Sequence, residues 1–190
     1  MIRAKYTDKA LIVDILTKAF DSNGSVNYVI KQDKRRAIRI RKLMEYSFEV
    51  CWHFGEIYLS DDKNGVVLLL LPEKKKTTIK AFMLDISLVI NSIGITRVFS
   101  VMKRESMVKK NHPENFIYLW YIGVTPGFQG KGIGSSLLEA IISLGNQRKR
   151  AVYLETSTQK NLQLYKRFGF NIYNEIDFNY KLYLLKRDFE

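Results

Sequence analysis

The chain has few residues of several types, and each scarcity excludes a class of protein. Its 190 residues include one cysteine, Cys51, and three prolines. A single cysteine forms no internal disulfide, which excludes small disulfide-stapled secreted scaffolds and is typical of a reducing compartment, so a cytoplasmic location is expected. Low proline and glycine content combined with 46% hydrophobic residues also excludes disordered and collagen-like chains.

Long apolar runs are also missing. Val66 to Leu71 is uninterrupted but short, and the most apolar region, 77–102, is broken by Lys80, Asp85 and Arg97. A membrane-spanning helix needs roughly 20 consecutive apolar residues. We therefore expect both segments to lie in the core of the domain and expect no membrane partner.

Positive charge is abundant: 31 lysines and arginines against 19 acidic residues give a net charge of +12. Such a surface attracts polyanions, which include nucleic acid, anionic membranes and phosphorylated small molecules. The basic residues are scattered, for example over 31–42 and 148–150, and no nucleic-acid-binding motif accompanies them. Nucleic-acid binding is therefore kept as an alternative, and a phosphorylated small molecule is the simpler partner.

Hydrophobic periodicity in the first half predicts short elements in a fixed order. They are a strand over Ile2–Tyr6, a helix capped by Thr7 and running to Phe20, a turn over Asp21–Ser25, a helix over about Asp33–Trp52, a hairpin of Glu56–Ser60 and Val66–Leu71, and helical segments over Thr77–Asn91 and Ile95–Lys109 that break at Gly94. The hairpin is expected to turn at Asn64–Gly65, since both residues tolerate positive φ.

The second half alternates strand and helix. We predict strands over Phe116–Val124, Ala151–Thr156 and twice within Phe170–Lys186, with helices ending near Arg148 and Phe168. This layout predicts an α/β (α+β) fold with a mixed sheet. Because no linker, repeat or low-complexity tract interrupts the chain, residues 1–190 are expected to form a single domain.

A glycine-rich turn carries the chemical information. Gln129-Gly130-Lys131-Gly132-Ile133-Gly134 follows a predicted strand and opens a predicted helix. Glycines let main-chain N–H groups converge without Cβ obstruction, and the helix N-terminus adds positive potential, so the turn predicts a pyrophosphate cradle. It matches neither the P-loop pattern nor the Rossmann G-x-G-x-x-G pattern.

The turn resembles the Q/R-x-x-G-x-G/A acetyl-CoA motif of the GNAT superfamily of N-acetyltransferases. A downstream block, Leu154-Glu155-Thr156-Ser157 followed by Asn161 and Tyr165-Lys166-Arg167-Phe168-Gly169-Phe170, resembles the second half of that signature. Within the superfamily, this form is most similar to the subgroup of puromycin N-acetyltransferase and its relatives. The resemblance covers roughly 111–170. It implies a GNAT fold, with a mostly antiparallel sheet of about six or seven strands flanked by helices on both faces.

The resemblance also implies a site for acetyl-CoA as cosubstrate. The strand ending at Val124 is expected to diverge from the strand over Val152–Thr156, and the pantetheine arm is expected to lie in the gap. The residues implied in cofactor binding are Ile122, Gly123, Val124, Gln129, Gly130, Lys131, Gly132, Ile133, Gly134, Ser135 and Asn161.

Two catalytic residues are expected, one for each proton transfer. The resemblance implies that Tyr165 protonates the leaving CoA thiolate, although its ring also has the spacing of a packing residue beside Phe168 and Phe170. A general base is harder to find: Glu155 is the candidate, acting through water or binding the cationic substrate, and the alternative is a paired charge on a strand. His112, before Pro113, is a candidate base but is expected to be exposed.

No metal site is expected, since two histidines and one cysteine give no ligand spacing. The predicted reaction is acetyl transfer to a primary amine by direct attack in a ternary complex, and the amine belongs to a small molecule or, as the alternative, to a protein. The alternatives are a catalytically idle acyl-CoA-binding or regulatory protein and, behind it, a nucleic-acid-binding protein. The acceptor and the oligomeric state stay open.

Overall fold

The computed structural model of the protein describes residues 1–190. Seven strands form one sheet in the order β1-β2-β3-β4-β5-β7-β6. The strands are β1 (Ile2–Arg3), β2 (Gly55–Leu59), β3 (Gly65–Leu70), β4 (Ile117–Val124), β5 (Val152–Thr156), β6 (Asn171–Asp177) and β7 (Lys181–Arg187). Only β4 and β5 run parallel, so the predicted mixed, mostly antiparallel sheet is confirmed.

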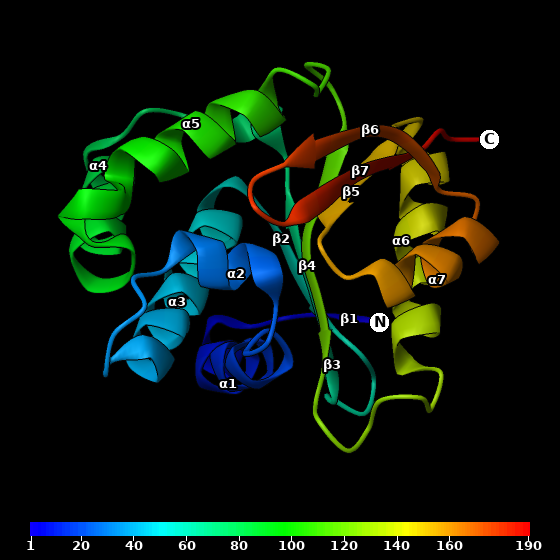
Figure 1. The fold of residues 1–190 in the computed structure, drawn as a ribbon. Coiled ribbons are helices and arrows are strands. Elements are labelled where there is room, and N and C mark those ends of the chain that lie inside the picture. Colours follow the sequence, from blue (N-terminus) through cyan, green and yellow to red (C-terminus); the bar gives the residue numbers. More distant parts are fainter.

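Helices cover both faces of the sheet (Figure 1). One face carries α1 (Lys9–Ala19), α2 (Gly24–Val29), α3 (Arg36–Phe54), α4 (Ile79–Leu88) and α5 (Val98–Lys109), and the other carries α6 (Ile133–Arg148) and α7 (Leu162–Arg167). Each face has its own apolar core. Ile12, Leu16, Met44 and Phe48 belong to the first, and Leu138, Ile141, Leu154 and Phe170 belong to the second.

The amino-terminal helix begins later than predicted. Residues Tyr6–Asp8 form a 3₁₀ turn, and Thr7 lies inside it instead of capping α1. The side chain of Asp8 accepts a hydrogen bond from the Lys5 N–H at 2.9 Å, so the carboxylate closes the turn. The Asp21–Ser25 turn is also shorter than predicted, because the Asn23 side chain accepts from the Val26 N–H at 3.1 Å and starts α2.

The β2–β3 hairpin is confirmed, but its turn differs. Lys63, with φ of 56°, has the left-handed conformation that was expected of Asn64 and Gly65. Ser60 and Gly65 close the loop through the Ser60 N–H and the Gly65 carbonyl at 2.9 Å. Gly65 is needed for packing: a Cβ there would lie 2.6 Å from the Cγ2 of Ile133 on α6.

Most of the apolar segment 77–102 lies outside the core, contrary to expectation, and only Ser92, Ile93 and Val101 are buried. The break at Gly94 is present, with φ of 78°, and a single π-helical turn (η3, Val89–Ile93) and a 3₁₀ turn (η4, Ile95–Arg97) flank it. However, α4 has no buried residue. By length and composition no single helix qualifies as a membrane span, and only the bent pair of 79–93 and 95–109 passes that test when both halves are taken together.

Gly55 predicts a stability effect, because β2 and β3 meet there without space for a side chain. A Cβ at Gly55 would lie 1.9 Å from the main-chain oxygen of Leu69, which the sheet holds in place. We expect Gly55→Ala to lower the free energy of unfolding by about 2–3 kcal/mol, in the range of other overpacking substitutions. Urea unfolding followed by circular dichroism measures this difference.

Gly134→Ala is the matched control for Gly55→Ala. A Cβ at Gly134 would lie 3.8 Å from the Cγ2 of Val124, an ordinary contact, and alanine favours a helix over glycine. The control is expected to leave the free energy of unfolding unchanged or raise it by up to about 1 kcal/mol. Equal destabilisation by both variants would contradict the steric explanation.

Candidate active site

Strands β4 and β5 separate along most of their length, as the family resemblance implied. They pair only at Ile117 with Val152 and at Tyr118 with Tyr153. Beyond these pairs, β4 continues to Val124 with β3 on one side and no strand on the other. The β4 edge from Leu119 to Val124 therefore presents main-chain groups to the gap, where an extended ligand can add as a strand would.

A bulge in β4 lies beside the point of separation. Leu68 pairs with Tyr121 and Leu69 pairs with Leu119, so Trp120 is the extra residue. Both Trp120 and Tyr121 pack against the core of the α1–α5 face. A bulge of this kind redirects the strand and its side chains, and such bulges are common next to active sites.

The glycine turn lies at the carboxyl end of β4. Gly127, Gly130 and Gly132 have φ of 87°, 78° and 83°, and a Cβ built on any of them would meet nothing within 4 Å. Glycine is thus required there by backbone conformation, and the space above the turn is open. Residues 126–132 are all exposed.

Seven consecutive N–H groups, from Gln129 to Ser135, donate to no acceptor in the protein. Three belong to the first turn of α6, whose N-cap, Gly132, offers no side chain. Unpartnered N–H groups and the positive end of a 16-residue helix favour a phosphate or diphosphate. Lys131 adds a cation 4.5 Å from the centre of the Phe128 ring, beside the turn.

Tyr165 lies on α7, in the core of the α6–α7 face. It is 6% exposed, and its ring packs edge-to-face on Phe170 with centroids 5.8 Å apart. The packing alternative for this residue is therefore realised, but its hydroxyl makes no hydrogen bond within the protein. Burial raises the pKa of Tyr165 to about 12, so the phenol stays protonated at neutral pH. Asn161, the N-cap of α7, also has a side chain without a hydrogen-bond partner in the protein.

Glu155 lies on β5, on the opposite face of the sheet from Tyr165, just beyond the last β4–β5 pair. Its side chain is 7% exposed, so it does not face bulk solvent, which was one of the two settings expected for it. One carboxylate oxygen accepts a hydrogen bond from the Tyr118 hydroxyl. The other lies 2.8 Å from His112 Nε2, outside hydrogen-bond geometry.

The exposure predicted for His112 is wrong. Its side chain is 8% exposed, and the centroid of its ring lies 4.9, 5.4 and 5.7 Å from the ring centroids of Phe116, Tyr118 and Tyr153, in tilted and edge-to-face arrangements. Burial and the nearby charge of Glu155 raise the pKa of Tyr118 well above its ordinary value, which keeps Tyr118 a hydrogen-bond donor to Glu155.

We refer to Glu155, His112 and Tyr118 as the Glu155 cluster. Sequence reasoning missed Tyr118 and could not place His112, because the pairing joins a loop, β4 and β5. Two of its atoms, His112 Nε2 and Glu155 Oε1, are buried without a hydrogen-bond partner. Together with Tyr165 across the sheet, the cluster puts titratable groups on both sides of the β4–β5 gap.

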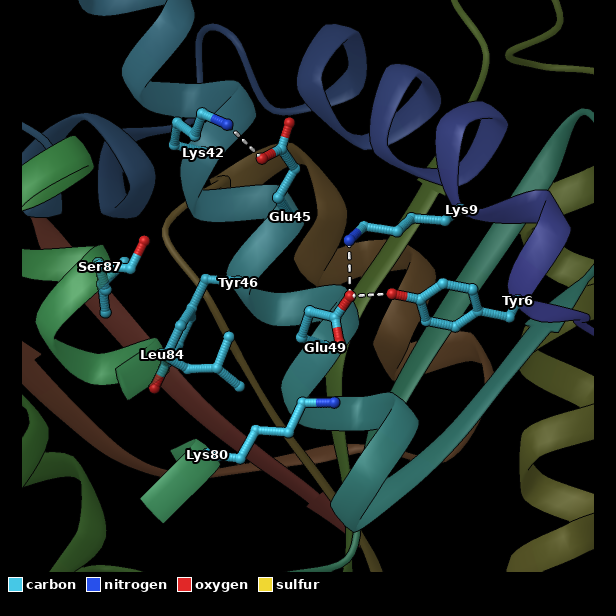
Figure 2. Close-up of a pocket in the computed structure, with 10 residues that line it drawn as sticks. Tyr6, Lys9, Lys42, Glu45, Tyr46, Glu49, Lys80, Leu84 and Ser87 are labelled. Atoms are coloured by element: carbon cyan, nitrogen blue, oxygen red, sulfur yellow. Dashed lines mark hydrogen bonds and ion pairs between the residues drawn. The ribbon is translucent and has the colours of Figure 1, made fainter. Parts of the chain in front are cut away.

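A cavity of about 330 Å³ lies elsewhere, between α3, α4 and the start of the chain (Figure 2). Both of its carboxylates are paired: Glu45 with Lys42 at 2.7 Å, and Glu49 Oε1 accepts from Lys9 Nζ at 2.6 Å and from the Tyr6 hydroxyl at 2.7 Å. No residue that lines it belongs to β4, β5, α6 or α7. This cavity is therefore separate from the β4–β5 gap.

Comparison with known proteins identifies the fold. Residues 93–170, which include α5, β4, the glycine turn, α6, β5 and α7, match the model of the Acetyltransferase (GNAT) family. An uncharacterized N-acetyltransferase of Schizosaccharomyces pombe is 38% identical over 63 residues, which is 33% of this chain and 26% of that protein. The chain thus matches about a quarter of the length of this curated relative.

Solved structures extend the likeness to the whole chain. A protein of Corynebacterium glutamicum, described as histone acetyltransferase HPA2 and related acetyltransferase, aligns over 100% of this chain and 95% of its own, with a TM-score of 0.71 and 21% identity. Arylalkylamine N-acetyltransferase 2 from Aedes aegypti covers 100% and 98%, with a TM-score of 0.64 and 15% identity. The C-terminal condensation domain of Ebony, in complex with beta-alanyl-dopamine, covers 98% and 97% with a TM-score of 0.69 and 8% identity.

Proposed function

We propose that this chain, whose fold and residues 93–170 are those of a GNAT N-acetyltransferase, transfers an acetyl group from acetyl-CoA to the primary amine of a small molecule. The observation that carries the proposal is the open edge of β4 leading to the seven free N–H groups of Gln129–Ser135. One end of that path suits an extended amide-bearing arm, and the other suits a diphosphate.

The residues present fit acetyl-CoA. Main-chain groups of Ile122, Gly123 and Val124 would bind the pantetheine arm, the N–H groups of 129–135 with Lys131 would bind the diphosphate, and the free side chain of Asn161 would bind a pantetheine amide. Acetyl-CoA supplies the acetyl group as a thioester. Because a Cβ at Gly130 or Gly132 would point into the open space of the turn, both glycines keep that space free for phosphate oxygens.

The reaction removes two protons from the acceptor nitrogen and adds one to the sulfur, and the chain has groups for these transfers. The acceptor ammonium would lose its first proton toward Glu155, whose carboxylate accepts a hydrogen bond from the Tyr118 hydroxyl and lies 2.8 Å from His112 Nε2. The free amine would then bond to the acyl carbon, the carbon–sulfur bond would break as the Tyr165 hydroxyl gives its proton to the sulfur, and the second proton of the nitrogen would pass through water to the Tyr165 oxygen and restore the phenol. Main-chain N–H groups on the free edge of β4 would stabilise the oxyanion.

Direct transfer is favoured over a covalent enzyme intermediate. Cys51, the one cysteine, is fully buried in the core, and burial raises the pKa of its thiol. A protonated thiol without solvent access is a poor nucleophile. The amine would therefore attack the thioester itself, in a ternary complex.

An aromatic surface favours an acceptor that carries a ring. Trp120, at the bulge, stacks on Tyr118 with ring centroids 6.4 Å apart and meets Tyr46 edge-on. Aromatic faces bind both flat rings and ammonium groups. Two of the structural neighbours have arylalkylamine or beta-alanyl-dopamine in their names, which agrees with this choice. The subgroup resemblance, to puromycin N-acetyltransferase, would give an aminonucleoside acceptor of the same general character.

Isothermal titration calorimetry with acetyl-CoA, and with ATP and NAD as comparison ligands, tests the proposal without the unknown amine. We expect saturable one-site binding of acetyl-CoA and weaker binding of the two nucleotides, which lack the pantetheine arm. A screen of aromatic amines by release of the CoA thiol then follows. Binding of acetyl-CoA without turnover of any amine would favour the alternative of a catalytically idle acyl-CoA-binding protein. No binding of acetyl-CoA would contradict the proposed binding site.

Lys131→Glu is expected to weaken acetyl-CoA binding by about tenfold or more, because it exchanges a cation for an anion at the diphosphate cradle. Lys34→Glu makes the same change in net charge at an exposed lysine far from the turn, and it is the matched control. Calorimetry at constant ionic strength measures both. Equal weakening by the two variants would mean that overall charge, and not the cradle, governs the affinity.

A further inference from the structure

The helical arm between β3 and β4, residues 72–110, leaves an apolar surface uncovered. On α4, the side chains of Ile79, Phe82, Met83 and Ile86 are 82%, 62%, 65% and 43% exposed. Their spacing of three and four residues places them along one face of the helix. Isolated exposed apolar residues are ordinary, but a continuous stripe of this kind marks an interaction site.

A second set of exposed apolar side chains lies beyond the bend at Gly94. Ile95, Phe99 and Met102 are 81%, 81% and 65% exposed, again at helical spacing. The opposite face of α5 carries Val101 and Val108, which are buried against the body of the protein. Helix α5 is therefore apolar on two faces, of which the fold covers only one, and α4 has no buried residue at all.

Lysines without ion-pair partners border the stripe. Segment 72–110 has nine basic and three acidic residues, a net charge of +6 and half of the total of the chain. Lys74, Lys75, Lys76, Lys80 and Lys103 are exposed, and none makes an ion pair. The three acidic groups are engaged: Glu73 with Arg150, Asp85 with the Tyr46 hydroxyl, and Glu105 with Arg104.

We propose that the arm docks this protein on the surface of an anionic lipid bilayer, with the apolar stripe in the headgroup region and the bordering lysines on the lipid phosphates. Amphipathic helices with exposed phenylalanines and flanking lysines bind membranes in this way. The expectation that no membrane is a partner rested on the lack of a membrane-spanning segment, which a helix lying on the bilayer surface does not need, and the exposed apolar residues of α4 suit such a helix.

The arm lies on the membrane and does not cross it. At 1.5 Å per residue, α4 and α5 are only about 15 and 18 Å long, against a hydrocarbon core of about 30 Å. The two helical segments that contain them, 79–93 and 95–109, meet at an angle of 99°. Arg104 ties α5 to the body of the protein through the Tyr180 hydroxyl at 2.8 Å and Ser25 Oγ at 3.2 Å, so the helix cannot leave the domain without breaking buried contacts.

A second copy of the chain suits this surface less well. A two-fold dimer would place each stripe against its own counterpart and bring the lysines of both borders together. An anionic bilayer instead neutralises the charge of these lysines, and a fluid lipid surface needs no shape complementarity to the protein. In Figure 1 the arm and the turn between β4 and α6 lie at opposite ends of the molecule, so a docked arm leaves the acetyl-CoA side facing water.

Vesicle co-sedimentation tests the proposal with the full chain at about 0.1 M salt. We expect binding to vesicles of phosphatidylcholine and phosphatidylglycerol in equal parts, and little binding to phosphatidylcholine alone. Phe82→Ser with Phe99→Ser should weaken binding at least about tenfold, since two exposed rings lose their contact with lipid. Ile172→Ser with Phe189→Ser, at exposed positions far from the arm, should have no effect.

A charge pair completes the experiment. Lys74→Glu with Lys76→Glu should weaken binding to anionic vesicles by about tenfold or more, whereas Lys166→Glu with Arg167→Glu on α7, which makes the same change in net charge, should have a much smaller effect. Binding of acetyl-CoA should be unchanged in the two arm variants, Phe82→Ser with Phe99→Ser and Lys74→Glu with Lys76→Glu, so failure of this proposal is distinguishable from failure of the proposed function. Equal binding to anionic and neutral vesicles would overturn the membrane proposal. So would self-association of the chain in sedimentation velocity, if Phe82→Ser with Phe99→Ser abolishes it.

Discussion

Tyr165→Phe is expected to lower kcat for acetyl transfer by about 10²- to 10⁴-fold, the usual contribution of a general acid. The substitution removes only the hydroxyl, which makes no hydrogen bond within the protein, and keeps the ring that packs on Phe170. The free energy of unfolding and the Kd for acetyl-CoA should therefore change little. Steady-state kinetics with a saturating amine, together with calorimetry, separate these quantities.

Tyr183→Phe is the matched control for Tyr165→Phe. Tyr183 packs against the same core on the same face of the sheet, and its hydroxyl also makes no hydrogen bond within the protein. We expect its kcat to stay within about twofold of wild type, as for other substitutions outside the reacting groups. A kcat for Tyr165→Phe equal to that of this control would leave Tyr165 as a packing residue only.

The raised pKa of Tyr165 gives this proposal a pH signature. With a pKa of about 12, the phenol remains a proton donor at every pH up to roughly 11. The wild-type rate should then show no fall on the alkaline side below that pH from loss of the acid. A decline in kcat that begins near pH 9 and disappears in Tyr165→Phe would contradict a phenol held protonated by burial.

Local patterns predicted the elements that position the site. The glycine turn, the strand before it and the helix after it depend on neighbours in the sequence, because positive φ at Gly130 and Gly132 and the start of α6 are properties of a few consecutive residues. The separation of β4 from β5 was available only through the family resemblance. Nothing in either strand alone shows that pairing stops after Tyr118 and Tyr153.

Features that depend on distant parts of the chain were missed. His112 looks like an exposed loop residue, and only the folded chain brings it 2.8 Å from Glu155, 43 residues later in the sequence. The apolar composition of α4 predicted burial, but composition does not show how many faces of a helix the rest of the fold can cover. Likewise, the left-handed residue of the hairpin loop is Lys63, because side chains within the loop fix its conformation. Asp62 Oδ1 accepts a hydrogen bond from the Asn64 N–H, and Ser60 Oγ accepts one from the Gly65 N–H.

Glu155→Gln is expected to lower kcat/KM by about 10²-fold or more, the usual contribution of a general base. The amide keeps the size of the carboxylate and can still accept a hydrogen bond from Tyr118, but it neither takes up a proton nor carries the charge that attracts an ammonium. The loss should shrink as pH rises, since more of the amine is then already unprotonated. A log plot of kcat/KM against pH should therefore be steeper for the variant than for wild type.

Glu49→Gln provides a matched control, since Glu49 is also a buried carboxylate that accepts from a tyrosine and faces a cation, yet it lies in the separate cavity of Figure 2. It should lower the free energy of unfolding and leave kcat/KM and its pH dependence unchanged. If His112 only positions Glu155, the kcat/KM of His112→Asn should lie between those of Glu155→Gln and Glu49→Gln. We expect it to be about 10- to 100-fold below wild type, with the pH dependence of wild type. If Glu155→Gln lowers kcat/KM by the same factor at every pH, the carboxylate has only a structural role toward β5 and its neighbours. The proton of the ammonium would then pass to water.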